Sequence, residues 1–283
     1  MTGIQAVQED QMGTRITVIS DNTPYAGLPG EWGLSLYVEH EDVRILTDAG
    51  ASGLFAQNME QLGLDIGKVD HAVLSHAHYD HSDGMPVFFE KNEKARLYIR
   101  DTAAEDCYHI KHFLPKYIGV TRHMLSRYAD RIEKVTGDFR LCDGAWLIPH
   151  KTGGLERIGI RERMYRKRGL IWRPDDFSHE QSLVLDTVKG LVIINSCSHG
   201  GVVNIIREVR DTFPGREVYG IIGGFHLFNK TDEEVRVAAE AIRDTGIGFV
   251  CTGHCTGERA CNILKSELNE RFSQLHVGLV LEF

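Results

Sequence analysis

The segment LSHAHYDHSDG, residues 74–84, places three histidines and an aspartate within six positions. Imidazole nitrogen and carboxylate oxygen are ligands that divalent zinc, manganese and iron accept in proteins. In a short turn after a strand, His76 and His78 can point at one ion, while Asp80 and His81 reach a second ion beside it. The alternative is a solvated, histidine-rich turn. We expect the segment to belong to a metal centre.

Three later apolar segments also end in metal-competent side chains. LVIINSCSHGG leads to Cys197 and His199, GIIGGFHL leads to His226, and GFVCTGHCTG leads to His254. Proteins of the α/β class usually place their sites at the carboxyl ends of sheet strands, because a rigid strand aims the side chain and the loop leaves it accessible. These strand ends are therefore expected to converge on one edge and supply a single pocket.

Hydrophobic periodicity predicts two similar stretches of strands and helices that carry these loops. The first has strands near 15–20, 34–39, 43–48 and 70–75 and a helix near 53–63. The second has strands within 182–196, 217–224 and 248–254, a helix near 202–212, and a helix that follows a capping signal at Thr231. Two such halves predict two sheets packed face to face with helices outside, a four-layer αββα sandwich of the α/β class.

Residues 101–180 separate the two stretches and are expected to form a helical, basic insertion or cap. ERIGIRERMYRKRGLIWRP includes Arg163, Arg166 and Arg168, in a chain whose formal net charge is −8. These arginines could draw a phosphate or carboxylate of a substrate into the metal cleft, or they could form a solvated helical face. Glu31, in a glycine-flanked turn, is a further candidate for the cleft, with an exposed loop contact as its alternative.

Length and composition place limits on the protein. The 283 residues, 42% hydrophobic and 25% charged, fit one large α/β domain over 1–283. The acidic balance disfavours nucleic acid or a membrane surface as a general partner. With no long apolar stretch and no signal-like start, we expect a cytoplasmic protein whose six cysteines are reduced. The oligomeric state, a homo-oligomer included, stays open.

The string H-x-H-x-D-H at 76–81, following VDHAVL, resembles the signature of the metallo-β-lactamase superfamily. The segments 30–39, 179–206, 223–227 and 252–257 are similar to a branch known as dihydropterin-ribofuranosyl-aminobenzene phosphate synthases or simply as metal-dependent hydrolases. The resemblance implies the metallo-β-lactamase fold and two divalent ions, zinc in the first place and iron or manganese as alternatives. Glutamate at the position of His78 would be typical of oxygen-reducing di-iron relatives, so histidine there favours hydrolysis or group transfer.

Carried over position by position, the resemblance assigns ligands to two ions. One ion would take His76, His78 and His199, with His150 as the alternative third ligand. The other would take the remaining family positions, which are Asp80, His81 and His254.

Two assignments next to these ligands stay open. The usual bridging glycine-aspartate is replaced by the segment 195–198, in which Cys197 is either a substitute bridge or a small buried side chain. Asp80 would also orient the attacking hydroxide. His226 is expected beside the ions, as a proton donor or a contact to substrate, and an ordinary hydrogen-bonded role is its alternative.

The expected function is a metal-dependent hydrolase that uses a metal-activated hydroxide on an ester or phosphate-containing small molecule. Three alternatives accompany it. The pterin branch implies a transferase that displaces pyrophosphate, with the metals holding the leaving group. A metal-bound sensor or binding protein would keep the fold with little turnover, and a nuclease would use the basic insertion as its arm. The expected partner is an anionic small-molecule substrate.

Overall fold

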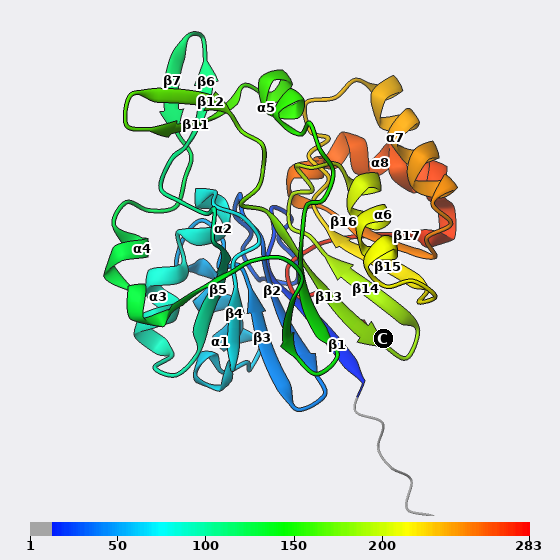
Figure 1. Ribbon diagram of the computed structural model, residues 1–283. Coiled ribbons are helices and arrows are strands. Elements are labelled where there is room, and N and C mark those ends of the chain that lie inside the picture. The colour runs from blue at the N-terminus through cyan, green and yellow to red at the C-terminus, as the bar shows by residue number, and fades with distance from the viewer. Residues whose placement is uncertain (1–12) are drawn as a thin grey trace, which may run out of the picture.

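The strands predicted from the first apolar runs assemble into one seven-stranded sheet with the order β18-β1-β2-β3-β4-β5-β8. The computed structural model describes residues 13–283 (Figure 1). The strands of this sheet are β1 Thr14–Ser20, β2 Ser35–His40, β3 Val43–Thr47, β4 His71–Val73, β5 Arg96–Arg100, β8 Ile132–Val135 and β18 Val280–Glu282. The four strands expected near 15–20, 34–39, 43–48 and 70–75 are therefore confirmed.

The second half of the chain forms another seven-stranded sheet, with the order β17-β16-β15-β14-β13-β10-β9. Its strands are β9 Phe139–Cys142, β10 Ala145–Pro149, β13 Gln181–Thr187, β14 Gly190–Ile194, β15 Val218–Gly223, β16 Phe249–Thr252 and β17 Phe272–Gln274. A turn at Val188 and Lys189 joins β13 to β14, which pair antiparallel.

Residues in β14 show why the two sheets stack. Leu191 and Ile193 pack in the core beneath the helices, whereas Val192 and Ile194 pack in the core between the two sheets. A strand that is covered on both faces reads as a continuous apolar run, because alternate side chains enter different cores. The four-layer αββα sandwich is therefore confirmed (Figure 1).

Helices cover the outer face of each sheet. On the first sheet, Phe55 and Phe88 join its outer core from α1 and α3. On the second, α6, α7 and α8 pack outside, and the predicted capping box starts α7, with Thr231 and Glu234 bonded reciprocally. The helices are α1 Leu54–Gln61, α2 Tyr79–Ser82, α3 Met85–Lys91, α4 Met124–Arg127, α5 Glu156–Glu162, α6 Val202–Thr212, α7 Asp232–Asp244 and α8 Glu258–Leu268.

Parallel pairing in the middle of both sheets determines where the loops emerge. Strands β3, β4, β5 and β8 pair parallel with one another in this order, and so do β14, β15, β16 and β17. Because parallel neighbours end at the same edge of a sheet, the loop after β4 emerges at the carboxyl edge of the first sheet, and the loops after β14, β15 and β16 emerge at that of the second. These loops carry the metal-competent side chains identified in the sequence. This topology gathers segments that are far apart along the chain.

The expected helical insertion over 101–180 is corrected by the structure. Strand β8 belongs to the first sheet and β9 and β10 to the second, so only part of this stretch stands apart. That part is a four-stranded sheet with the order β12-β11-β6-β7, beside the short helix α5 (Figure 1). Its strands are β6 Cys107–Lys111, β7 Leu114–Tyr117, β11 Met164–Arg168 and β12 Ile171–Pro174. Pairs such as Met164 with His109 join strands 55 residues apart, which a local periodicity does not reveal.

Within residues 13–283, no helix has the length and apolar character that crossing a bilayer requires. All six cysteines lie in this part of the chain and are free thiols. The expected single unit of 1–283 also includes residues 1–12, which lie outside the described residues.

Candidate metal centre

The four metal-competent side chains of residues 74–84 are buried between the end of β4 and the first residues of α2. Strand β4 ends at Val73 and helix α2 begins at Tyr79, so the residues between them belong to neither a strand nor a helix. The ring centroid of His76 lies 4.6 Å from that of His78 and 4.3 Å from that of His81. All four residues are buried, with at most 8% of their surface exposed. The alternative of a solvated turn is excluded.

The loop after β14 brings His199 to the first two histidines of that segment. The His199 ring centroid lies 4.9 Å from those of His76 and His78. One nitrogen from each ring lies within 4.8 Å of the others, a spacing that allows one ion to be held between them. The three histidines assigned to one ion therefore lie together.

The other three assigned side chains also meet. Asp80 Oδ2 lies 3.5 Å from His254 Nε2 and 3.8 Å from His81 Nε2. Burial opposes ionisation of Asp80, but His81 and His254 outweigh it and hold the pKa of this carboxyl well below its usual range. A carboxylate between two imidazoles is a suitable donor set for a second divalent ion.

Cys197 lies between the two groups. Its Sγ is 3.2 Å from His81 Nε2, and the sulfur also lies within 4.8 Å of ligand nitrogens of His76 and His199. Its neighbour Cys255 approaches to 3.4 Å, sulfur to sulfur. Cys197 is thus the side chain in the segment 195–198 whose position allows contact with both ions.

Buried nitrogens without partners provide a test of whether metal ions fit here. Nε2 of His76, His78 and His254, and both ring nitrogens of His199, have no hydrogen-bond partner within residues 13–283. Such groups cost free energy unless something binds them. Burial lowers the pKa of His78 to about 3 and also lowers the pKa values of His76 and His199, so these rings are neutral and keep the lone pairs that metals require. The donor set fits a pair of divalent ions.

Hydrogen bonds from the outer ring nitrogens orient three of the imidazoles. His81 Nδ1 lies 2.8 Å from Asp48 Oδ2, and His76 Nδ1 lies 2.9 Å from Ser75 Oγ, which itself donates to Asp48. His254 Nδ1 lies 3.1 Å from the side-chain oxygen of Asn22. Each contact places the proton on Nδ1 and leaves Nε2 free for a metal. Asp48 thereby orients two rings at once.

Replacing Asp48 with asparagine is expected to weaken metal binding by about 10–100-fold, because the His81 ring loses its anionic partner. Competition with a chromophoric chelator measures the change in affinity. Asp42→Asn, in the exposed turn after β2, is the matched control and should leave the affinity unchanged. Equal affinities in the Asp48 variant and the parent protein would show that this carboxylate does not position the ring.

His150 has a different role from the alternative metal ligand considered above. It forms ion pairs with Glu180 and with Glu208, and the two carboxylates raise its pKa to about 9 despite the opposing effect of burial. Glu180 also accepts the backbone N–H groups of His199 at 3.0 Å and Gly200 at 3.1 Å. This buried group of charges therefore fixes the loop that carries His199.

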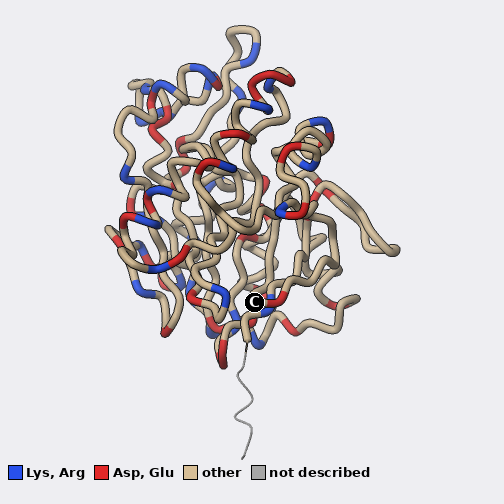
Figure 2. The backbone as a smooth tube through the Cα atoms, turned by 90° about the vertical axis from the view of Figure 1, so that its right-hand side faces the viewer, with Lys and Arg blue, Asp and Glu red and all other residues tan. Residues whose placement is uncertain are grey.

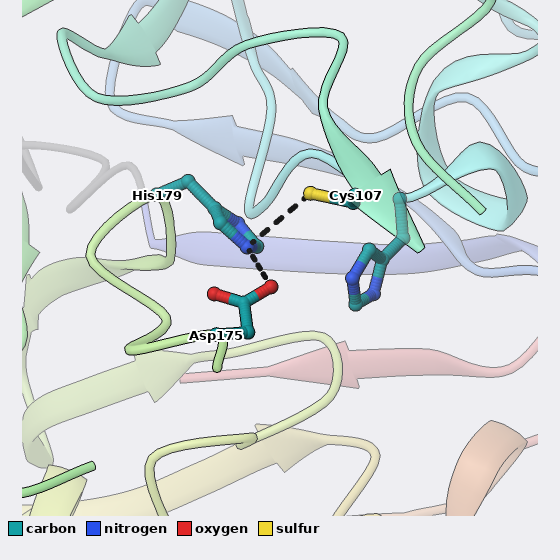
Figure 3. Close-up of side chains that lie close together, drawn as sticks. Cys107, Asp175 and His179 are labelled. Carbon is teal, nitrogen blue, oxygen red and sulfur yellow. Dashed lines mark hydrogen bonds and ion pairs between the residues drawn. The ribbon is translucent and has the colours of Figure 1, made fainter. Parts of the chain in front are cut away.

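A second buried cluster, of Cys107, Asp175 and His179, contacts the loop that carries His76 and His78. His179 lies between Asp175 and Cys107 (Figure 3), with its Nε2 3.1 Å from Asp175 Oδ2 and 3.7 Å from Cys107 Sγ. Its Nδ1 accepts the backbone N–H of Ala77 at 3.1 Å, so the ring proton sits on Nε2 and faces Asp175. Because Nε2 carries a proton, this nitrogen is a hydrogen-bond donor and not a metal ligand. The cluster fixes Ala77 between His76 and His78.

A cleft of about 280 Å³ opens above the ligands. It is lined by His78, Asp80, Cys197 and His199, by three aromatic side chains, and by basic side chains of the small sheet. The aromatic residues are Trp32, Tyr79 and Phe228, and the basic residues are His109, Lys111 and Lys116.

The structure places the residues expected to bind substrate mostly outside this cleft. Glu31 accepts hydrogen bonds from Ser20, Ala51 and Ser52 and holds its own loop, while its neighbour Trp32 donates from Nε1 to Asp80 Oδ2 at 3.0 Å. Of the two residues in this glycine-flanked turn, Trp32 lines the cleft and Glu31 does not.

The arginines of the insertion face another cavity. Arg166 and Arg168 each form an ion pair with Asp106, at 3.1 Å and 2.9 Å. They line a space beside Arg173 and not the cleft of the metal ligands. Arg163 ends α5 in the left-handed region, with φ of 56°, and is not among the residues that line the cleft.

His226 stands at the rim of the cleft. Its ring centroid lies 4.6 Å from that of His199, and its Nε2 is 4.0 Å from Glu162 Oε2. Its backbone N–H donates to Cys255 Sγ at 3.3 Å, in a left-handed conformation with φ of 50°. The ring therefore lies next to the ligands of the first ion and faces the open cleft.

Comparison with known proteins finds relatives that span most of this chain. A synthase named 7,8-dihydropterin-6-methyl-4-(beta-D-ribofuranosyl)-aminobenzene-5'-phosphate synthase, from Methanocaldococcus jannaschii, is 29% identical over 269 residues, which cover 89% of this chain and 90% of that protein. An uncharacterized protein of the same organism is 27% identical and covers 94% of this chain and 99% of its own length. The crystal structure of Tm1679, described as a metal-dependent hydrolase of the beta-lactamase superfamily, superposes with a TM-score of 0.81 at 29% identity, covering 95% of this chain and 99% of that one.

The sequence pattern of the family described as the metallo-beta-lactamase superfamily matches residues 33–254, a span that runs from the loop of Trp32 to His254. Every side chain of the two ligand groups lies within it. With its four-layer fold and these ligands at the carboxyl ends of its strands, the chain is an enzyme that belongs to the metallo-β-lactamase superfamily.

Proposed function

We propose that this enzyme is a metal-dependent hydrolase that acts on an ester or phosphate-containing small molecule. The observation that carries the proposal is the presence of two adjacent ligand groups, with Cys197 between them, at the floor of an open cleft. An enzyme needs an accessible coordination position, whereas a purely structural site is closed by protein ligands. The open cleft also favours catalysis over a metal-bound sensor.

The side chains around the cleft have distinct roles in this proposal. Two bound divalent ions would lower the pKa of a coordinated water and stabilise negative charge on the attacked group. Asp80, held by the Trp32 indole N–H at 3.0 Å, orients the nucleophilic water. His226 at the rim donates a proton to the leaving group, and Glu162 lies 4.0 Å from its Nε2.

The donor set favours zinc over manganese. Cys197 places a thiol among imidazoles, and a soft thiolate combined with nitrogen ligands suits zinc, whereas manganese prefers oxygen. Iron is the alternative outcome of a metal analysis. Two zinc ions per chain are the expected content.

A pterin-type transferase is the second candidate. The 29% identity with the aminobenzene-5'-phosphate synthase over nine-tenths of both chains favours it. In this version divalent ions held by the same ligand groups would bind the leaving pyrophosphate, and an aminobenzene derivative would replace water as the nucleophile. The three aromatic side chains of the cleft offer surfaces on which flat rings can pack.

A nuclease is less favoured than either. In the view of Figure 2, segments with Lys and Arg are interspersed with segments that carry Asp and Glu. Long nucleic acids are bound through many phosphate contacts, which such a surface does not offer.

A metal analysis followed by a substrate panel tests the proposal. The panel holds a carboxylic ester, a phosphodiester, and a pterin pyrophosphate with an aminobenzene acceptor, each given to the zinc-loaded protein and to His78→Ala. We expect hydrolysis that depends on His78, with pyrophosphate transfer as the result that favours the second candidate. Equal rates in the two proteins would remove metal chemistry at this site.

A further inference from the structure

The small four-stranded sheet turns one basic face toward the metal cleft. His109 and Lys111 are two positions apart in β6, so they share a face, and Lys116 of β7 pairs directly with His109. All three side chains line the cleft that also contains His78 and Asp80. Cations and metal ligands therefore face the same space.

These cations have no acidic partners of their own. Neither lysine has a carboxylate oxygen within 4.0 Å in residues 13–283, although the same part of the chain holds many such pairs. Two carboxylates line the cleft, and both are already engaged: Glu162 by Lys230 and Asn229, and Asp80 by Trp32. The lysines are free to bind an anion.

The surroundings of His109 report the same excess of positive charge. Burial lowers its pKa, and Arg163, Lys111 and Lys116 lower it further. An anion placed among these groups relieves their mutual repulsion and gains charge-assisted hydrogen bonds.

We propose that His109, Lys111 and Lys116 form a second anion-binding site, which holds a phosphate monoester at one end of a substrate whose reacting group lies over the metal ligands. This inference rests on the proposed function and adds the substrate class: a small molecule with two anionic groups. Lysine ammonium groups are point charges suited to a phosphate dianion, and two of them balance its charge. Tyr79 lies beside this site, with Lys116 Nζ 5.8 Å from its ring centroid, and gives the middle of the substrate an aromatic surface.

Binding calorimetry with a homologous series of alkane-α,ω-diol bisphosphates and the corresponding alkyl monophosphates tests the site. The zinc-loaded full chain is compared with Lys111→Met/Lys116→Met and with the charge-preserving Lys111→Arg/Lys116→Arg. Lys167→Met is the matched control, because this lysine lies in the same small sheet but packs over Trp172, 5.1 Å from the ring centroid. Its strand position places it on the opposite face from His109.

We expect the best bisphosphate to bind the parent protein at least about tenfold more tightly than its monophosphate, since the second phosphate gains charged hydrogen bonds. The methionine variant should bring this ratio close to one, while the arginine variant and the Lys167 control keep it. A ratio near one in the parent, a ratio unchanged in the methionine variant, or no measurable bisphosphate binding would overturn the second site.

The same titrations separate this inference from the proposed function. If removal of zinc with a chelator leaves the monophosphate affinity of the methionine variant unchanged, the metal-centred function fails. A lysine-dependent advantage of the bisphosphate would still support the second anion site in that case.

Discussion

Replacing His199 with leucine is expected to abolish hydrolysis and, at the same time, to make the metal-free protein more stable. Both ring nitrogens of His199 are buried without partners, and the ring stacks on Phe177 at 4.9 Å with planes 3° apart. An apolar side chain keeps that packing and removes the unsatisfied groups, which should raise the free energy of unfolding by about 1–3 kcal/mol. Losing a ligand of the first ion should lower the rate by about 10³-fold, because several kcal/mol of charge stabilisation disappear.

Urea denaturation in the presence of a chelator measures the unfolding free energy of the metal-free protein. A rate measurement after zinc loading measures the loss of hydrolysis. His179→Leu provides the contrast, because His179 has partners on both nitrogens and its loss leaves Asp175 buried without its proton donor. That variant should be destabilised. A metal-free His199→Leu protein that is less stable than the parent would contradict our view that this ring is present for the metal alone.

Sequence reasoning predicted that the side chains of the two candidate ligand groups would meet because of where they stand relative to apolar runs. His76 and His81 follow β4, His199 follows β14, and His254 follows β16. Each run is apolar because its strand is buried on both faces, and the parallel order of strands places the carboxyl ends together. Strand periodicity and ligand chemistry were therefore sufficient to predict that these side chains meet, whereas the family resemblance divided them between two ions.

The residues that orient the ligands gave no comparable signal. Asp48 lies 33 positions before His81, and Glu180 lies 30 positions after His150. Which carboxylate meets which imidazole depends on the register between strands and on how the two sheets stack. Asp48 does share one property with the ligands, a place directly after an apolar strand, and that position was an available signal.

The insertion was misread for a related reason. Its high charge suggested a solvated helix, yet Arg166 and Arg168 alternate as residues of one strand face do, and Arg173 pairs directly with Arg166. One pairing partner of β11, the strand β12, follows it directly, but the other, β6, lies far back along the chain and gives no local signal. The basic groups that reach the cleft, Lys111 and Lys116, lie outside the arginine-rich segment.

A second large effect is expected when Glu180 is replaced with glutamine. Glu180 accepts from the His150 ring and from the backbone N–H of Gly200 through one oxygen, and from the N–H of His199 through the other. A glutamine amide puts an N–H group against one set of donors and removes the charge that compensates His150. Breaking a buried ion pair on one side costs about 3–5 kcal/mol, and urea denaturation at pH 6 should show this loss. Glu270→Gln, at an exposed position after α8, is the control and should be neutral.

The pH dependence of this loss follows from the direction of each pKa shift. The pKa of His150 is raised from 6.5 to about 9, so its contribution is complete below about pH 6.5 and disappears as the pH rises through 9. The pKa values of Glu180 and Glu208 are lowered, the latter to about 2, so their contribution is present above about pH 4.5 and disappears in acid. The difference in unfolding free energy between the parent and Glu180→Gln should therefore be largest between about pH 5 and 6.5 and shrink toward pH 9. A difference that grows between pH 7 and 9 would mean that His150 is neutral in the folded protein, and that the loop of His199 is fixed by the backbone hydrogen bonds of Glu180 alone.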